Sequence, residues 1–79
     1  MQLQEAQKWK EEGNANYKLD KFEEAASAYS KALKACPSNH ADRAVYFKNR
    51  SACYLKLLKY DKAAQDATAG EVLNKIALA

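Results

Sequence analysis

The residue types that most often carry out chemistry are scarce in this 79-residue sequence. It has two cysteines, Cys36 and Cys53, and one histidine, His40. The cysteines do not form a Cys-x-x-Cys pair, and with a single histidine they cannot complete a zinc ligand set at the usual spacings. No base accompanies His40, no glycine-rich phosphate loop is present, and no pair of carboxylates marks a site. We therefore expect no catalytic residue, no metal site and no cofactor, and a protein that is not an enzyme.

The same residues, and the large aromatic ones, have simpler structural roles. We expect Trp9 and Tyr29 to be core residues, because large aromatic side chains dominate the packing of small domains. Cys36 and Cys53 are expected to behave as small buried hydrophobic residues. His40 falls between the predicted helices, where we expect it to be solvated.

The charge and the hydropathy of the chain restrict its partners. The net charge is +3, with 48% hydrophobic and 29% charged residues. Positive residues alternate with glutamates such as Glu11 and Glu24, which argues against nucleic-acid binding, and the mild positive charge suits acidic peptides better. No apolar run approaches the roughly 18 residues of a membrane helix, and the N-terminus does not resemble a secretory signal. We expect a cytoplasmic protein that binds neither nucleic acid nor a membrane.

The sequence repeats itself with an offset of 38 residues. Small residues match small ones, aromatic residues match aromatic ones, and charges keep their sign. The matched pairs are Trp9 and Phe47, Gly13 and Ser51, Lys18 and Lys56, Leu19 and Leu57, Phe22 and Tyr60, Glu23 and Asp61, Ala25 and Ala63, and Ala26 and Ala64. The chain is therefore an array of two units rather than one irregular domain.

Each unit reads as two helices joined by a short turn. Helix-forming residues run over 4–18, and apolar residues recur at helical spacing over 22–35. Pro37 ends this second helix. The third helix is predicted to begin near Ala41 or Asp42, with Asp42 as the candidate N-cap, and to run to about Leu57. A fourth helix follows it.

Gly13 interrupts the first predicted helix, at a cost of about 1 kcal/mol relative to alanine. Two antiparallel helices can approach closely only where their side chains are small. We therefore expect Gly13, with Ala25 and Ala32, to make room for a neighbouring helix, while residues such as Tyr29 fill the gaps around them.

These residues resemble the tetratricopeptide repeat family, which has a period of about 34 residues. The residues that match its pattern in the first unit are Trp9, Gly13, Tyr17, Phe22, Ala25, Tyr29, Ala32 and Pro37, and those in the second unit are Phe47, Ser51, Tyr54, Tyr60, Ala63 and Ala67. The resemblance implies an all-α fold with about four antiparallel helices in two helix-turn-helix repeats. It implies one domain over 1–79, with repeats at about 5–39 and 42–79, atypical after 68.

Within that family the chain is similar to co-chaperone modules, such as those of the UCS-type myosin chaperones and the heat-shock organising co-chaperones. Their groove clamps the C-terminal carboxylate of heat-shock chaperones that end in Glu-Glu-Val-Asp. By this resemblance Lys10, Asn14 and Asn49 bind the peptide carboxylate, because a lysine supplies charge and the amides supply directed hydrogen bonds. The resemblance also gives the groove-lining residues, which are Tyr17, Lys48, Ala52 and Lys56.

The resemblance fades after Thr68, and the cations that a third unit contributes to the family's clamp have no match. The clamp is therefore expected to be incomplete. Val72, Leu73 and Ile76 continue an apolar stripe past Gly70, so the fourth helix either runs on to about residue 78 or kinks and folds back. An uncovered stripe favours self-association. The alternatives to peptide binding are accordingly a homodimeric structural module or a fragment of a longer protein.

Overall fold

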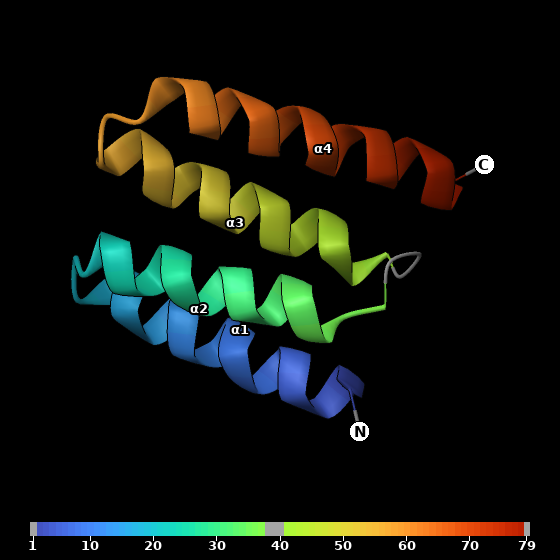
Figure 1. Cartoon of the computed structure of the whole chain (residues 1–79), viewed down its shortest axis with the longest axis horizontal. Coiled ribbons are helices and arrows are strands. Elements are labelled where there is room, and N and C mark those ends of the chain that lie inside the picture. Colours follow the sequence, from blue (N-terminus) through green and yellow to red (C-terminus); the bar gives the residue numbers. More distant parts are fainter. Residues whose placement is uncertain (1, 38–40, 79) are drawn as a thin grey trace.

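The computed structural model describes residues 2–37 and 41–78, with side chains for 3–37 and 41–72. Its helices are α1 (Gln2–Lys18), α2 (Phe22–Ala35), α3 (Asp42–Lys56) and α4 (Tyr60–Leu78). They run in alternating directions in one stack, with α1 at one edge and α4 at the other (Figure 1). Each helix packs against the next in the chain. The predicted all-α fold with four antiparallel helices is confirmed. No helix, over the described ranges, is long and apolar enough to cross a membrane.

The helix boundaries agree with the sequence pattern for α2, and within a residue or so for α3 and for the end of α4. α1 begins two residues before the predicted start. The prediction of Asp42 as an N-cap is wrong, because Ala41 takes that position and Asp42 is the first helical residue. Its carboxylate still lies in the first turn, where the helix dipole favours a negative charge. α4 continues through Gly70 without a break, so the predicted alternative of a folded-back end does not occur.

The turns that join α1 to α2 and α3 to α4 have the same backbone design. Asp20 and Leu58 each take a φ of 60° and follow the end of a helix. The next residue then donates its amide hydrogen to a carbonyl five residues earlier, at 2.9 Å from Lys21 and 2.8 Å from Lys59. This is the Schellman arrangement, which satisfies carbonyls that a helix end leaves free. The two units are thus repeated in backbone as well as in sequence.

Among the described residues, most of the core lies in two groups of buried side chains, and α2 contributes to both. The first group is Ala6, Ala32, Leu33, Cys36 and Tyr46, and the second is Ala25, Ala26, Tyr29 and Cys53. Alanine is frequent in both groups, which lets the helix backbones approach closely. Trp9 packs at the edge of the first group and Tyr29 lies within the second, as expected for core aromatics.

Gly13 lies directly under the ring of Tyr29. A methyl group placed on Gly13 would lie 2.7 Å from Cε1 of that ring. The expectation that a neighbouring helix needs this space is therefore confirmed. The 38-residue offset matches Gly13 with Ser51 and Tyr29 with Ala67. The second unit therefore has a larger residue in place of the glycine and a smaller residue in place of the tyrosine. The Ser51 hydroxyl donates to the Ala63 carbonyl at 2.7 Å.

Arg50 links three helices from the middle of α3. Its guanidinium donates twice to the Asp66 carboxylate on α4, at 2.7 Å each, and once to the Ser30 hydroxyl on α2, at 2.9 Å. The hydrogen bonds with Asp66 raise the pKa of Arg50 above its ordinary value. The bidentate geometry fixes direction as well as distance, so Arg50 sets the rotation of α3 about its own axis.

Arg43 performs a related task at the start of α3. Its guanidinium donates to the carbonyls of Leu33, at 2.7 Å, and Cys36, at 3.2 Å, at the C-terminal end of α2. A cation at this end of a helix satisfies free carbonyls and opposes the negative end of the dipole. The first turn of α3 is thereby held against the last turn of α2.

Candidate functional site

A hollow of about 350 Å³ lies where α1 and α3 face each other across α2. Both units supply its walls. The lining residues are Asn14, Tyr17 and Lys18 from α1, Tyr29 from α2, and Asn49 and Ala52 from α3. We call this hollow the inter-unit groove.

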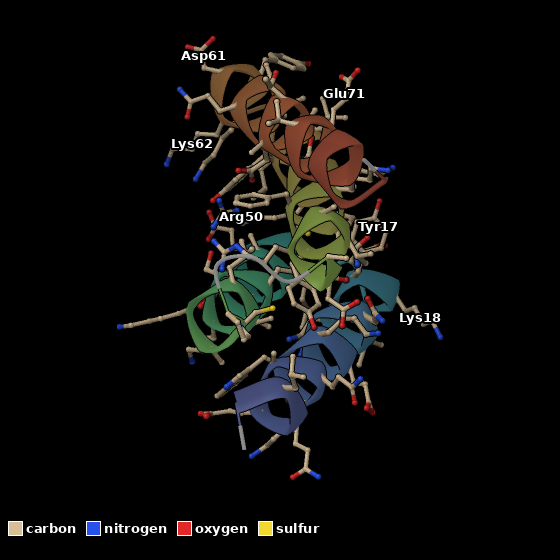
Figure 2. All side chains as sticks on the ribbon, turned by 90° about the vertical axis from the view of Figure 1, so that its right-hand side faces the viewer. Tyr17, Lys18, Arg50, Asp61, Lys62 and Glu71 are labelled. Carbon is tan, nitrogen blue, oxygen red and sulfur yellow. The ribbon has the colours of Figure 1, made fainter. Side chains whose placement is uncertain are left out.

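Helical spacing explains why these side chains converge. Residues three or four apart lie on the same face of a helix, which holds for Asn14, Tyr17 and Lys18 and again for Asn49 and Ala52. Arg50 points toward Ser30 and Asp66, whereas its neighbour Asn49, about 100° away around the helix axis, lines the groove. Tyr17 and Lys18 project on the side of the molecule away from Arg50 (Figure 2).

The Asn14 side chain accepts a hydrogen bond from a residue of α2. The Tyr29 hydroxyl donates a hydrogen bond to Oδ1 of Asn14. Burial raises the pKa of Tyr29 to about 12, and the nearby Cys53 and Tyr17 add to this shift. The hydroxyl therefore keeps its proton, and its role as a donor, at any physiological pH.

The groove offers hydrogen bonds and positive charge rather than a nucleophile. Two side-chain amides, from Asn14 and Asn49, and the ammonium group of Lys18 provide donors around it. Among the described residues, its lining includes no carboxylate, thiol or imidazole. A ligand that presents acceptor oxygens and a negative charge complements this surface.

The structure brings together four of the seven residues that the sequence assigns to the groove. Asn14, Tyr17, Asn49 and Ala52 line one hollow. Lys10 is half-buried one helical turn before Asn14 and does not line it, and Lys56 is exposed one turn beyond Ala52. Whether any of these residues holds a ligand stays a prediction.

Lys48, the remaining predicted residue, lines a second hollow of about 350 Å³, together with Ser51, Ala67 and Glu71. This hollow lies between α3 and α4. It occupies the place that the Tyr29 ring fills in the first unit, because the equivalent residue, Ala67, has no ring. The second hollow is thus lined by the residue that replaces the tyrosine of the first unit.

Sequence reasoning missed two residues of the inter-unit groove. Lys18 follows Asn14 by four residues, and this spacing alone could have placed it on the same helical face. Tyr29 was assigned to the core by its size, which is correct for the ring. Its hydroxyl reaches the groove because Gly13 lets the ring lie against α1, and no spacing within one helix reveals that.

The two cysteines are buried and take no part in the groove. Burial raises the pKa of the Cys53 thiol to about 11, and it also raises the pKa of Cys36. Both thiols are therefore protonated at neutral pH, which suits the expected role of small hydrophobic residues. His40 lies outside the described residues.

Two similar helix pairs with a groove between them define a helical-repeat scaffold. Residues 6–39 match the tetratricopeptide repeat model. The chain belongs to the tetratricopeptide repeat family, and it is a protein–protein interaction module.

Its relatives are much longer proteins. The chain is 37% identical over 73 residues to the mitochondrial import receptor subunit TOM70 of Rattus norvegicus, an alignment that covers 91% of this chain and 12% of that protein. It is 43% identical over 60 residues to protein unc-45 homolog B of Danio rerio, which covers 75% of this chain and 6% of that protein. The Xenopus tropicalis unc-45 homolog B is 46% identical over 59 residues, with 75% and 6% covered. The matches to unc-45 homologs confirm the resemblance to the UCS-type myosin chaperones.

Proposed function

We propose that the inter-unit groove binds the acidic C-terminal peptide of another protein by its terminal carboxylate. The proposed partners are cytosolic heat-shock chaperones that end in Glu-Glu-Val-Asp. The protein would then act in the cytoplasm as a co-chaperone-type module, without catalysing a reaction. The observation that carries this proposal is the meeting of Asn14 and Asn49, one from each unit, in one hollow.

The chemistry of the groove supports a carboxylate in particular. Each carboxylate oxygen accepts more than one hydrogen bond, and two side-chain amides can donate from opposite walls. Lys18 brings a positive charge to the lining, which strengthens hydrogen bonds to an anion. Lys10 and Lys56 extend this charge along the two helices that form the walls.

The upstream residues of an acidic peptide would meet the remaining wall. Tyr17 and Ala52 add a half-buried apolar surface beside the amides. Lys48 then flanks the second hollow, where a glutamate of the peptide could pair with it at the surface. Such exposed pairs are worth little individually, so we expect the two amides to dominate the affinity.

Fluorescence anisotropy with a labelled Glu-Glu-Val-Asp peptide tests the proposal. We expect saturable binding to the wild-type chain, and roughly tenfold or greater loss of affinity for Asn49→Ala, because a lost hydrogen bond to a charged group costs about 1.5–3 kcal/mol. Lys10→Ala should weaken binding less, since Lys10 does not line the hollow. Absence of binding at high micromolar protein would reject the proposal.

Matched variants separate the groove from general effects of charge and helicity. Lys34→Ala removes an exposed lysine from α2, and Asn16→Ala removes an amide that lines a different surface of α1. Neither change should affect the affinity, and circular dichroism should show the same helicity for all variants. Equal losses in Asn16→Ala and Asn49→Ala would argue against the groove.

Self-association through α4 is a second candidate function. In the first unit α3 covers the face of α2 that carries Ala26 and Leu33. The residues of α4 at the equivalent offsets, Ala64 and Glu71, are exposed, and so is Val72. A second copy packed on this face would form a homodimer. A monomeric mass by light scattering at high protein concentration would exclude it.

A further inference from the structure

Tyr29 combines an immobile ring with a hydroxyl at the edge of the groove. The side chain is only 2% exposed. One face of the ring lies against the backbone at Gly13, so close that an added methyl group would lie 2.7 Å from Cε1. The other ring neighbours belong to the core group of Ala25, Ala26 and Cys53. The position of the hydroxyl is therefore determined by core packing rather than by the groove.

The partner of this hydroxyl is an otherwise exposed amide. Asn14 lies on the outer part of α1, where a terminal amide could adopt either of two orientations. The Tyr29 hydroxyl donates to Oδ1, so the carbonyl end of the amide is engaged below the groove. The Nδ2 end, which carries both hydrogens, is then left for the groove.

We infer that Tyr29 is a specificity-determining residue, which fixes the Asn14 amide so that its Nδ2 hydrogens, and not its carbonyl oxygen, face the groove. A ligand group that accepts hydrogen bonds, such as a terminal carboxylate, is favoured, and a group that must donate, such as a terminal carboxamide nitrogen, is rejected. This inference rests on the proposed function for its choice of ligand. The orientation of the amide can be tested without any ligand.

The second unit supports this assignment by contrast. The offset of 38 residues places Ala52 at the equivalent of Asn14 and Ala67 at the equivalent of Tyr29. Both members of the pair are therefore replaced together. The first unit therefore has a hydrogen-bonded pair of hydroxyl and amide that the second unit lacks.

The protonation of the hydroxyl makes the arrangement insensitive to pH over the physiological range. The pKa of Tyr29 is raised to about 12, chiefly by burial. A phenolate would accept rather than donate, and would allow the amide to turn over. At neutral pH this state does not arise, so the orientation of Asn14 is constant.

NMR relaxation of the Asn14 side-chain amide tests the orientation directly. In Tyr29→Phe the ring remains over Gly13 but the donor is lost. We expect the order parameter of the Asn14 Nδ2 group to fall from about 0.8 to below about 0.6, the range of a flexible group. Two controls should show no such change: Asn14 in Tyr54→Phe, which removes the hydroxyl of a half-buried tyrosine on α3, and the Asn16 amide in Tyr29→Phe. An unchanged order parameter for Asn14 in Tyr29→Phe would overturn the inference.

Peptide binding tests the consequence for specificity. Wild-type protein should prefer a Glu-Glu-Val-Asp peptide with a free carboxylate over the same peptide with a C-terminal carboxamide. Tyr29→Phe should weaken binding of the acid about fivefold and reduce the preference, whereas Tyr54→Phe should do neither. Asn14→Asp keeps an acceptor for the Tyr29 hydroxyl but turns a second oxygen toward the groove. The affinity of this variant for the peptide with a free carboxylate should therefore fall more than tenfold.

The two experiments fail independently. If wild-type protein binds neither peptide, the proposed function is wrong, and the relaxation data alone decide whether Tyr29 orients Asn14. If wild-type protein binds the acid and Tyr29→Phe binds it equally well, the groove functions without this device and the inference is wrong.

Discussion

At Gly13 the missing side chain determines how α1 and α2 pack. Alanine is the better helix former by about 1 kcal/mol, so Gly13→Ala would stabilise an isolated helix. Here the added methyl group would meet the Tyr29 ring at 2.7 to 2.9 Å. Overpacking of this kind typically costs about 1–3 kcal/mol. We expect a net loss of about 1 kcal/mol or more in the free energy of unfolding, measured by urea denaturation.

The Tyr29→Leu background isolates this clash, because leucine lacks the ring atoms that the methyl group would contact. In that background Gly13→Ala should be neutral or stabilising. The second unit already combines a larger residue, Ser51, with a smaller one, Ala67. An increase in stability on Gly13→Ala in the wild-type chain would contradict the packing described for this pair.

Leu58 combines an unfavourable backbone conformation with an exposed apolar side chain. It has a φ of 60° and a side chain that is 69% exposed. The left-handed region costs an L-residue about 1–2 kcal/mol, and an exposed leucine gains little from packing. Leu58→Gly should therefore stabilise the protein by roughly 1 kcal/mol, as measured by the midpoint of urea unfolding.

The adjacent residue provides the control for this change. Leu57 has a φ of −87° and is half-buried, so Leu57→Gly should destabilise the protein. The turn of the first unit has an aspartate, Asp20, at the position of Leu58, and aspartate tolerates this conformation better. A loss of stability in Leu58→Gly would show that the leucine side chain has a partner that offsets its strain.

At the scale of the helices, Arg50 and Asp66 determine how α3 and α4 fit together. The Arg50 side chain is 20% exposed and that of Asp66 is 7% exposed. Removing one partner of a buried pair leaves a charge without compensation and costs about 3–5 kcal/mol. We expect Asp66→Ala to cost about 3 kcal/mol, near the lower limit because Arg50 is partly solvated. Thermal and urea unfolding measure this loss.

Asp61 lies on the same helix and is exposed, which makes Asp61→Ala the matched control. Its effect should remain within about 0.5 kcal/mol. Asp66→Asn, which retains one acceptor for the guanidinium, should fall between the two. Equal stability of Asp66→Ala and Asp61→Ala would mean that the pair contributes nothing to the association of α3 with α4.

The elements also show what the sequence could and could not predict. Helical periodicity predicted α2 with its observed bounds, and the 38-residue offset predicted two similar helix pairs. The family resemblance placed Asn14 and Asn49 in one groove, and the structure has both lining one hollow. The Arg50–Asp66 pair and the Tyr29–Asn14 hydrogen bond could not be predicted, because each joins different helices. Their formation depends on how the helices rotate against each other, which no periodicity within one helix contains.

Over the part of the chain that the structure describes, most of the core lies in two groups of side chains, and each group contains one buried cysteine and one buried tyrosine. Cys36 and Tyr46 belong to the first group, and Cys53 and Tyr29 to the second. Burial raises the pKa of all four, to about 11 for Cys53 and about 12 for Tyr29. The folded state therefore holds these protons more tightly than the unfolded chain does.

This difference predicts alkaline destabilisation of the whole fold. Below the unfolded pKa values, about 8.5 for cysteine and about 10 for tyrosine, both states are protonated and stability does not change with these groups. As the pH rises further, the unfolded chain loses protons first, and the free energy of unfolding must fall. We expect the midpoint of urea unfolding to decrease steadily from about pH 8.5 to about pH 11, with cysteine responsible for the first part of the decline.

In a Cys36→Ala, Cys53→Ala double variant the midpoint of urea unfolding should stay constant up to about pH 9.5 and decline only where tyrosine titrates. If the double variant retained the full slope between pH 8.5 and 9.5, groups outside the core would have to explain it.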